Sequence, residues 1–196
     1  MTQMLDLDLS KTAFISIDLQ QGILNSGILF PHTNTEVLEA NNKIAAALKN
    51  TKALITLVNV DVSTFHYLHP HHSDAKPMQL PETYAELSMN IAADSTAKNV
   101  IKVTKYNPGA FFGTDLDLQL RRRGIDTLIL TGVATANGVY ATALDAYQHG
   151  YHLLVIEDAC ADRDEQLHTI FFEKLFPKIS YTLKTTELLD LIQQAI

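Results

Sequence analysis

Apolar runs recur along the chain and alternate with amphipathic stretches. Each run is four to eight residues long, rich in β-branched residues, and ends near a polar or charged position. The runs are Thr12–Ile17, Ala53–Val60, Val100–Val103, Thr127–Leu130, Tyr151–Ile156 and the weaker Ile179–Leu183. Near-continuous apolar runs of this kind are typical of parallel strands that are covered on both faces. The pattern therefore predicts six buried strands.

Helical spacing of apolar residues fills the intervals between these runs. The predicted helices are Thr35–Lys49, Thr114–Arg123, Gly138–His149, Glu165–Leu175 and Thr185–Ile196. Thr114 has the features of a capping residue, with Asp117 three positions later. The alternation of strands and helices predicts an α/β fold with a doubly wound, mostly parallel, six-stranded sheet and helices on both faces. We expect the Rossmann-like order 3-2-1-4-5-6 and a single domain over residues 1–196.

Composition narrows the class of protein. Hydrophobic residues make up 46% of the chain and charged residues 19%, and the net charge is -7. The first two values are typical of a well-packed globule rather than a disordered chain. The negative net charge argues against a nucleic-acid-binding domain, which usually carries a basic patch. The single cysteine, Cys160, excludes an intramolecular disulfide and suits a reducing cytosol. Because we find neither a signal peptide nor an apolar run of about 18 residues, we expect a cytoplasmic protein that binds neither nucleic acid nor membrane.

Charged and polar residues follow the predicted strands at the edge where open α/β sheets bind ligands. They are Asp18, Asp61, Lys105, the Gly132–Gly138 turn and Asp158. Asp18 and Lys105 carry opposite charges, and an unpaired charge next to a buried strand is costly. A pair formed by the two would shift the pKa of both groups and make them candidate catalytic residues. The alternative is that each is a solvated strand-end residue or a cap.

The turn TGVATANGV joins a predicted strand to a predicted helix. Gly132 and Gly138 flank a short polar segment whose backbone N–H groups suit an anion or a developing oxyanion. The turn lacks the Gly-Lys-Ser/Thr of a Walker loop and the spacing of a dinucleotide-binding motif. A tight connection that binds no ligand remains an equal alternative on this pattern.

Three motifs resemble those of isochorismatase-like and nicotinamidase-like hydrolases, in the same order along nearly the whole chain. They are FISIDLQQGIL, the long core segment from TKYNPGAFFGT through LILTGVATANGV to ALDAYQHGY, and VIEDACADRDEQLH. The resemblance implies a catalytic triad of aspartate, lysine and cysteine. Asp18 and Lys105 match the first two, whereas Gly138 falls at the nucleophile position. It also implies a cis peptide bond at Val133–Ala134 and an oxyanion hole formed by the N–H groups of Ala134 and Gly138.

A glycine at the nucleophile position changes the expected reaction. Hydrolysis of an amide through a thioester needs the thiol. The isochorismatase branch instead cleaves a vinyl ether without a covalent intermediate and can carry glycine there, with the aspartate as acid. We therefore expect a hydrolase of a small, carboxylated metabolite, although segments typical of true isochorismatases are not evident. The alternatives are a catalytically silent ligand-binding or scaffold protein, and a cysteine-to-glycine change introduced deliberately at position 138.

The long irregular stretch Asp61–Pro81 predicts a lid. The nicotinamidase branch binds zinc through an Asp-x-His pair, but Asp61 is followed by Val62 and Ser63. His66, His69, His71, His72 and Asp74 have spacings that can bind zinc, yet we expect a polar lid, with no metal and no cofactor. Substrate contacts are expected from Asp61, His66, Tyr67, Phe111 and Phe112.

The resemblance also implies assembly into a homodimer or homotetramer. The candidate surface is the helix Gly138–His149, with Val139, Tyr140 and Leu144 on one face. A face packed into the core would show the same pattern.

Overall fold

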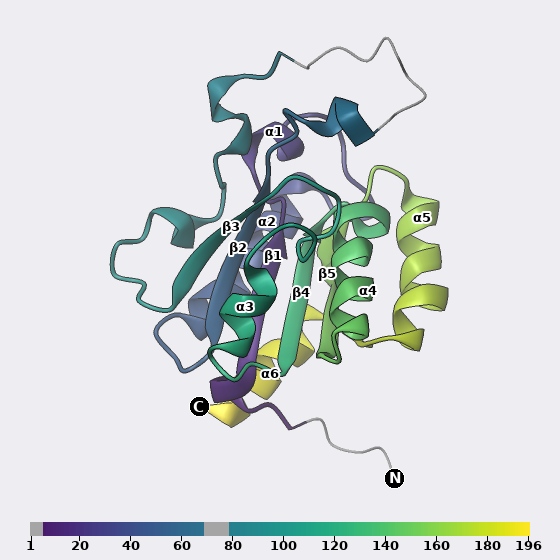
Figure 1. Ribbon diagram of the computed structural model, residues 1–196. Coiled ribbons are helices and arrows are strands. Elements are labelled where there is room, and N and C mark those ends of the chain that lie inside the picture. The colour runs from purple at the N-terminus through teal and green to yellow at the C-terminus, as the bar shows by residue number, and fades with distance from the viewer. Residues whose placement is uncertain (1–5, 69–78) are drawn as a thin grey trace.

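The computed structural model describes residues 6–68 and 79–196, and its centre is one parallel sheet (Figure 1). Six strands pair in the order β3-β2-β1-β4-β5-β6, and each pairing is parallel. The strands are β1 (Thr12–Ile17), β2 (Leu54–Val60), β3 (Val100–Lys105), β4 (Thr127–Val133), β5 (His152–Ala161) and β6 (Tyr181–Leu183). The predicted fold class and strand order are confirmed.

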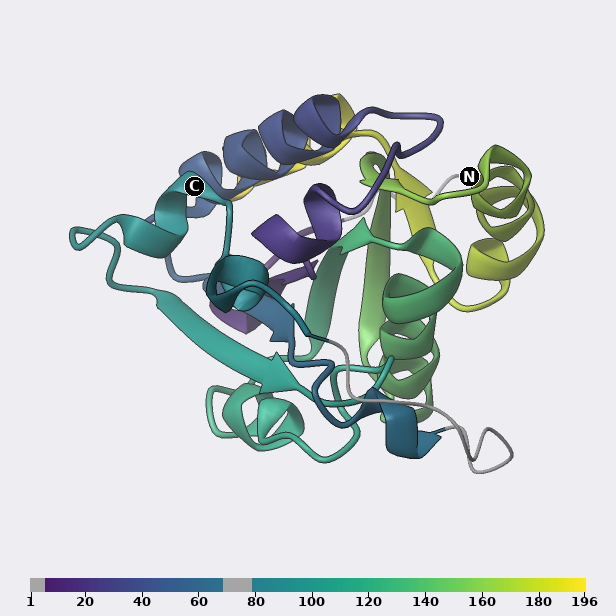
Figure 2. The same cartoon turned by 90° about the horizontal axis from the view of Figure 1, so that it is seen from above.

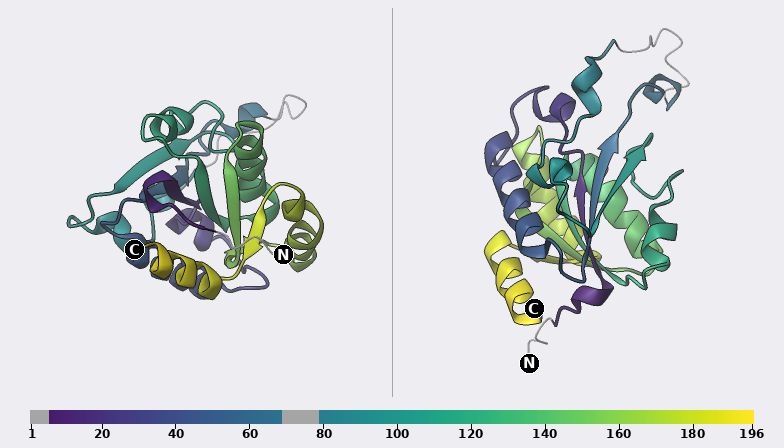
Figure 3. Two further views of the ribbon diagram at one scale, coloured as in Figure 1. Left: turned by 90° about the horizontal axis from the view of Figure 1, so that it is seen from below. Right: turned by 90° about the vertical axis from the view of Figure 1, so that its left-hand side faces the viewer.

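Helices cover both faces of the sheet (Figures 2 and 3). The helices are α1 (Gln21–Leu24), α2 (Asn34–Leu48), α3 (Leu116–Arg121), α4 (Tyr140–Gln148), α5 (Glu165–Ile170) and α6 (Thr185–Ala195). One apolar cluster joins α2 and α6 to the sheet, and a second joins α3 and α4 to the opposite face. In the described part of the chain, no helix has the length and apolar character needed to cross a membrane.

Local capping explains where the best-predicted helix begins. Thr33 accepts a hydrogen bond from the Glu36 backbone N–H, and Glu36 accepts one from the Thr33 N–H, which forms a capping box at the start of α2. The helix α3 begins at Leu116, two residues after the predicted start at Thr114. The predicted capping residue still contacts this end of the helix, because Thr114 Oγ1 accepts a hydrogen bond from the Leu116 N–H at 3.2 Å and donates one to the Ala110 carbonyl.

The fifth strand is longer than predicted because it pairs past an irregularity. Between Leu130 and Gly132 of β4 the register shifts, and β5 then continues beside β4 to Ala161. Asp158 therefore lies within β5, not beyond its end. Its Oδ1 accepts hydrogen bonds from the N–H and hydroxyl of Thr185, so this carboxylate caps α6.

Gly132 allows β4 to approach β1 closely. Its φ is +116°, and a Cβ at this position would lie 2.1 Å from the carbonyl oxygen of Ile17. A side chain here would clash with backbone and adopt a strained conformation. The chain then passes through a π-helical turn, Thr135–Val139, before α4 begins.

Candidate functional site

Asp18 and Lys105 meet at the carboxyl ends of β1 and β3. Lys105 is the last residue of β3, Asp18 follows β1, and β2 pairs with both strands. The Lys105 Nζ atom lies 2.8 Å from Asp18 Oδ2 and donates to the Asn107 carbonyl at 3.2 Å. Only 6% of Asp18 and 1% of Lys105 is exposed. The structure thus joins the two charges into a buried ion pair.

The second carboxylate oxygen of Asp18 is the unusual feature of this pair. Among the described residues, the buried Oδ1 has no hydrogen-bond partner. Burial raises the pKa of Asp18 from 3.8 to about 6, and the charge and hydrogen bond of Lys105 offset only part of that rise. Asp18 also has a φ of +54°, which is uncommon outside glycine and is found at strained functional positions. A carboxyl group in this setting can hold or release a proton near neutral pH.

The turn after β4 forms the next wall of the site. The peptide bond between Val133 and Ala134 is cis, and the π-helical turn follows at once. The Ala136 N–H donates to Asp162 Oδ2 at 2.7 Å, and the other oxygen of Asp162 accepts the Arg163 N–H at 2.7 Å. Asp162 therefore fixes the turn against the end of β5.

Gly138 lies directly beside the Asp18 carboxyl group. A Cβ at position 138 would be 3.2 Å from Asp18 Oδ2 and 3.1 Å from Ile17 Cγ2. The Gly138 carbonyl accepts a hydrogen bond from the Thr142 hydroxyl at 2.7 Å. Both Cβ distances are shorter than ordinary van der Waals contacts, so the turn packs closely against the ion pair at this glycine.

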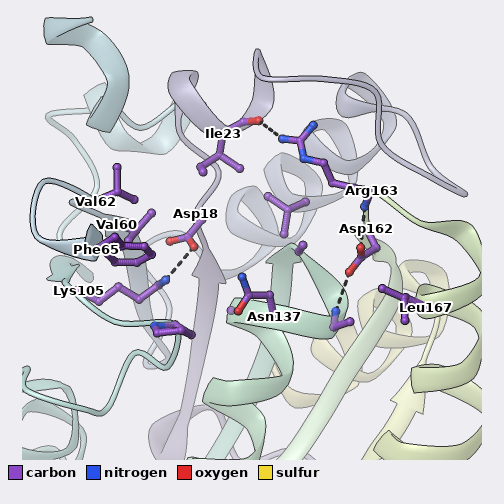
Figure 4. Close-up of a pocket in the computed structure, with 15 residues that line it drawn as sticks. Asp18, Ile23, Val60, Val62, Phe65, Lys105, Asn137, Asp162, Arg163 and Leu167 are labelled. Atoms are coloured by element: carbon purple, nitrogen blue, oxygen red, sulfur yellow. Dashed lines mark hydrogen bonds and ion pairs between the residues drawn. The ribbon is translucent and has the colours of Figure 1, made fainter. Parts of the chain in front are cut away.

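These groups line a cavity of about 360 Å³, which falls in the size range of small-molecule sites (Figure 4). Its polar side chains are Asp18, Lys105, Asn137, Asp162 and Arg163. Its apolar wall includes Ile23, Val60, Val62, Phe65 and Leu167. The cavity lies at the carboxyl edge of the sheet where β1 separates the two halves of the strand order, the usual ligand position in such folds.

The two predicted aromatic contacts lie away from this cavity. Phe111 is buried and stacks on His149, with ring centroids 5.2 Å apart, and it also packs against Tyr151. Phe112 is 69% exposed. Neither side chain is among those that line the cavity.

The residues of the predicted lid differ in whether they line the cavity. Asp61 is half-buried, its carboxylate accepts the Ser63 N–H, and it does not line the cavity. His66 and Tyr67 belong to a short 3₁₀ helix, Phe65–Leu68, of which Phe65 reaches the cavity. The further loop residues of the zinc alternative, His69, His71, His72 and Asp74, lie outside the described residues.

Asp162 and Arg163 are cavity residues that the sequence reasoning missed. Both follow β5, whose end the apolar run placed at Ile156, five residues before its last residue, Ala161. The charged tripeptide DRD follows the true end of the strand, but it does not reveal the register shift that extends β5 to Ala161.

Of the three residues named for the assembly surface, Val139 is buried, Tyr140 is half-buried and Leu144 is exposed. Val139 is fully buried, and Tyr140 packs edge-on against Phe171 with ring centroids 4.8 Å apart. Of the three residues, Leu144 is 37% exposed, and Tyr147 on the same helix is 51% exposed.

A doubly wound parallel sheet with a charged cavity at its carboxyl edge defines the class of the protein, an α/β fold with a pocket of small-molecule size. Comparison with known proteins gives the family. The family model described as isochorismatase domain matches residues 12–187, and the chain belongs to the isochorismatase family, whose members include hydrolases.

Relatives match over nearly the whole chain. The uncharacterized isochorismatase family protein YecD of Escherichia coli is 36% identical over 192 residues, which covers 95% of this chain and 99% of that protein. A solved isochorismatase family protein from Burkholderia thailandensis is 28% identical and has a TM-score of 0.79, with 96% of this chain and 98% of that chain covered. Maleamate amidohydrolase of Pseudomonas putida is 28% identical over 167 residues, or 81% of this chain and 76% of that enzyme.

Proposed function

We propose that this protein hydrolyses a small, carboxylated metabolite without a cysteine nucleophile and with Asp18 as the acid/base. The observation that carries the proposal is the buried Asp18 carboxyl group. One of its oxygens is held by Lys105, and among the described residues the other has no hydrogen-bond partner. A pKa of about 6 lets this group exchange a proton with substrate near neutral pH.

The remaining groups have separate roles in the proposal. Lys105 orients Asp18 through Oδ2 and leaves Oδ1 for the substrate. The backbone N–H groups of Ala134 and Gly138 would stabilise an anion or a developing oxyanion, because both residues line the cavity. Gly138 stands in place of the family's thiol, so water is the nucleophile.

Arg163 supports an acidic substrate. Arg163 lines the cavity, and its guanidinium points toward the Ile23 carbonyl (Figure 4). Its Nη2 donates to the Ile23 carbonyl at 2.9 Å and to the Ser26 hydroxyl at 2.6 Å. A guanidinium has five N–H donors and pairs well with carboxylates. The P. putida relative is named for maleamate, a small amide that also carries a carboxylate, which agrees with this choice.

Two reactions suit this arrangement. In vinyl-ether cleavage, protonated Asp18 gives its proton to the enol carbon, water adds to the resulting cation, and the hemiketal breaks down to a ketone and an alcohol. In C–N hydrolysis, ionised Asp18 takes a proton from water as the water attacks the carbonyl carbon. The protonated carboxyl group then gives that proton to the leaving nitrogen as the tetrahedral intermediate collapses and the C–N bond breaks. The first reaction needs the acid form of Asp18 and the second needs the base form, so their pH dependence differs in direction.

Product release from a panel of enol ethers, including isochorismate, and of small amides tests the proposal. Pyruvate and ammonia are measured for the wild type, Asp18→Asn and Asp61→Asn. Asp61 is the matched control, because it also stands at a strand end but does not line the cavity. Loss of pyruvate release in Asp18→Asn alone would support ether cleavage, and loss of ammonia release would support water-dependent C–N hydrolysis. Full activity in Asp18→Asn would refute the proposal, and no turnover in the wild type would favour a silent binding protein.

A further inference from the structure

A second cluster of reactive side chains lies outside the cavity of Asp18. His32 precedes α2, Glu157 lies in β5, and His168 lies in α5. The Nε2 atoms of His32 and His168 are each 3.3 Å from the same oxygen, Oε1 of Glu157. One nitrogen or oxygen of each side chain lies within 4.8 Å of the others. None of the three lines the cavity of Asp18, so the cluster is separate from the site described above.

The two nitrogen–oxygen distances are those of long hydrogen bonds, and they also match the spacing of ligands around a metal ion. An N–H···O bond in proteins usually measures about 2.7–3.2 Å between nitrogen and oxygen. Zinc binds imidazole nitrogen and carboxylate oxygen at about 2.0–2.2 Å in a tetrahedral arrangement, which separates neighbouring ligand atoms by about 3.3–3.5 Å. Both nitrogens stand 3.3 Å from the carboxylate oxygen. Two imidazoles and one carboxylate are also a common zinc-binding set.

Neighbouring groups hold two of these ligands in place. The His168 ring is 2% exposed, packs on Phe172 with ring centroids 4.7 Å apart, and has its Nδ1 2.9 Å from the Thr135 hydroxyl. The other carboxylate oxygen of Glu157, Oε2, contacts the Lys184 ammonium. Hydrogen bonds to the far side of a ligating imidazole or carboxylate are typical of metal sites, because they fix the orientation of the ligand. Nε2 of His168 and Oε1 of Glu157 are thus left to face His32.

Solvent can reach the cluster from one side. The side chains of His32 and Glu157 are 24% and 21% exposed, which leaves an open approach for a cation and a water molecule. His32 borders a groove of about 540 Å³ whose charged side chains are Glu36, Glu39, Lys43, Asp158 and Lys184. Carboxylates outnumber lysines in this groove, so its potential favours cations.

We propose that His32, Glu157 and His168 form a zinc site with water as the fourth ligand. A bound Zn²⁺ would tie the segment before α2 to β5 and α5. Through the Thr135 hydroxyl it would also brace the turn that carries Gly138, since Thr135 begins that turn. The proposal does not depend on the hydrolase reaction, because no zinc ligand is a residue of the Asp18 cavity.

Zinc binding to the tag-free, EDTA-treated full chain tests the site. Calorimetric titration is expected to give about one equivalent for the wild type, and zinc should raise the midpoint of thermal unfolding, because a ligand that binds the folded state stabilises it. Glu157→Gln and His32→Ala should bind zinc at least tenfold more weakly.

Two controls separate this site from other histidines. His152→Ala removes an exposed histidine from the same strand and should bind zinc like the wild type. The quadruple variant His66→Ala, His69→Ala, His71→Ala and His72→Ala removes the loop histidines and should also bind zinc normally. Thermal unfolding in EDTA shows whether each variant folds, and Glu157→Gln, which keeps the size of the side chain, decides the matter if His32→Ala does not fold. Absence of zinc binding in the wild type, binding lost in the loop variant, or wild-type affinity in Glu157→Gln would overturn the proposal.

Discussion

Replacing Lys105 with methionine is expected to raise the pKa of Asp18 well above its wild-type value of about 6. The change keeps a long buried side chain and removes the charge that stands 2.8 Å from Asp18 Oδ2. Burial then remains as the dominant influence on the carboxyl group, and burial favours its neutral form.

The size of the expected pKa shift follows from the distance between Asp18 and Lys105. At an effective dielectric constant of about 20, unit charges 2.8 Å apart attract by about 6 kcal/mol. An adjacent cation lowers a carboxyl pKa by about 1–3 units in practice, because both groups are partly compensated by other interactions. Loss of Lys105 should therefore move the pKa of Asp18 from about 6 to roughly 7–9.

The titration can be followed without a substrate. Carboxyl carbons of aspartates labelled with ¹³C are recorded by NMR against pH, and the Asp18 signal is assigned by its absence in Asp18→Asn. Lys105→Arg, which keeps the charge, serves as the control and should titrate near the wild-type pKa. An Asp18 pKa in Lys105→Met that equals or falls below the wild-type value would refute the reasoning.

Three further predictions concern Gly138, Gly132 and the stability of the fold. Gly138→Cys should react with iodoacetamide, as measured by mass spectrometry. The wild type should not react, because its Cys160 is fully buried and burial raises the pKa of that thiol. Equal labelling of the two proteins would contradict this prediction. Gly132→Ala should lower the free energy of unfolding, measured in urea, by at least about 2 kcal/mol, because the new Cβ would lie 2.1 Å from the Ile17 carbonyl oxygen. Gly113 also has a positive φ but has no atom within 4 Å of a Cβ, so Gly113→Ala should lower it by about 1 kcal/mol. Between pH 3.8 and 6, Asp18 keeps its proton in the folded state and loses it in the unfolded state. The free energy of unfolding of the wild type should therefore fall by roughly 3 kcal/mol over this range, relative to that of Asp18→Asn. Parallel pH profiles of the two proteins would contradict this prediction.

The sequence predicted those parts of the site that depend on local pattern. The end of β1 at Ile17 and the apolar run before Lys105 placed both charges at the same edge of the sheet, where the structure joins them. Parallel pairing in a doubly wound sheet is enough to bring such residues together.

The parts of the site that the sequence did not predict depend on contacts between distant segments of the chain. The register shift beside Gly132 allows β5 to continue to Ala161. No local sequence pattern predicts this shift, so Asp162 and Arg163 were not predicted at the carboxyl edge of the sheet. The orientation of the Phe111 side chain is set by its packing on His149. An aromatic residue after a strand has the same sequence pattern whether its side chain faces a cavity or the core. The same reason explains why the sequence pattern left open whether Val139 faces a surface or the core, in which it is buried.

The most direct test of the account is the value of kcat/KM for Asp18→Asn on a compound that the wild type hydrolyses. General acid–base catalysis contributes about 100- to 10,000-fold, so the account predicts a loss of that size in Asp18→Asn and wild-type activity in Asp61→Asn. An Asp18→Asn variant that keeps its fold and its full kcat/KM would contradict the central role of Asp18.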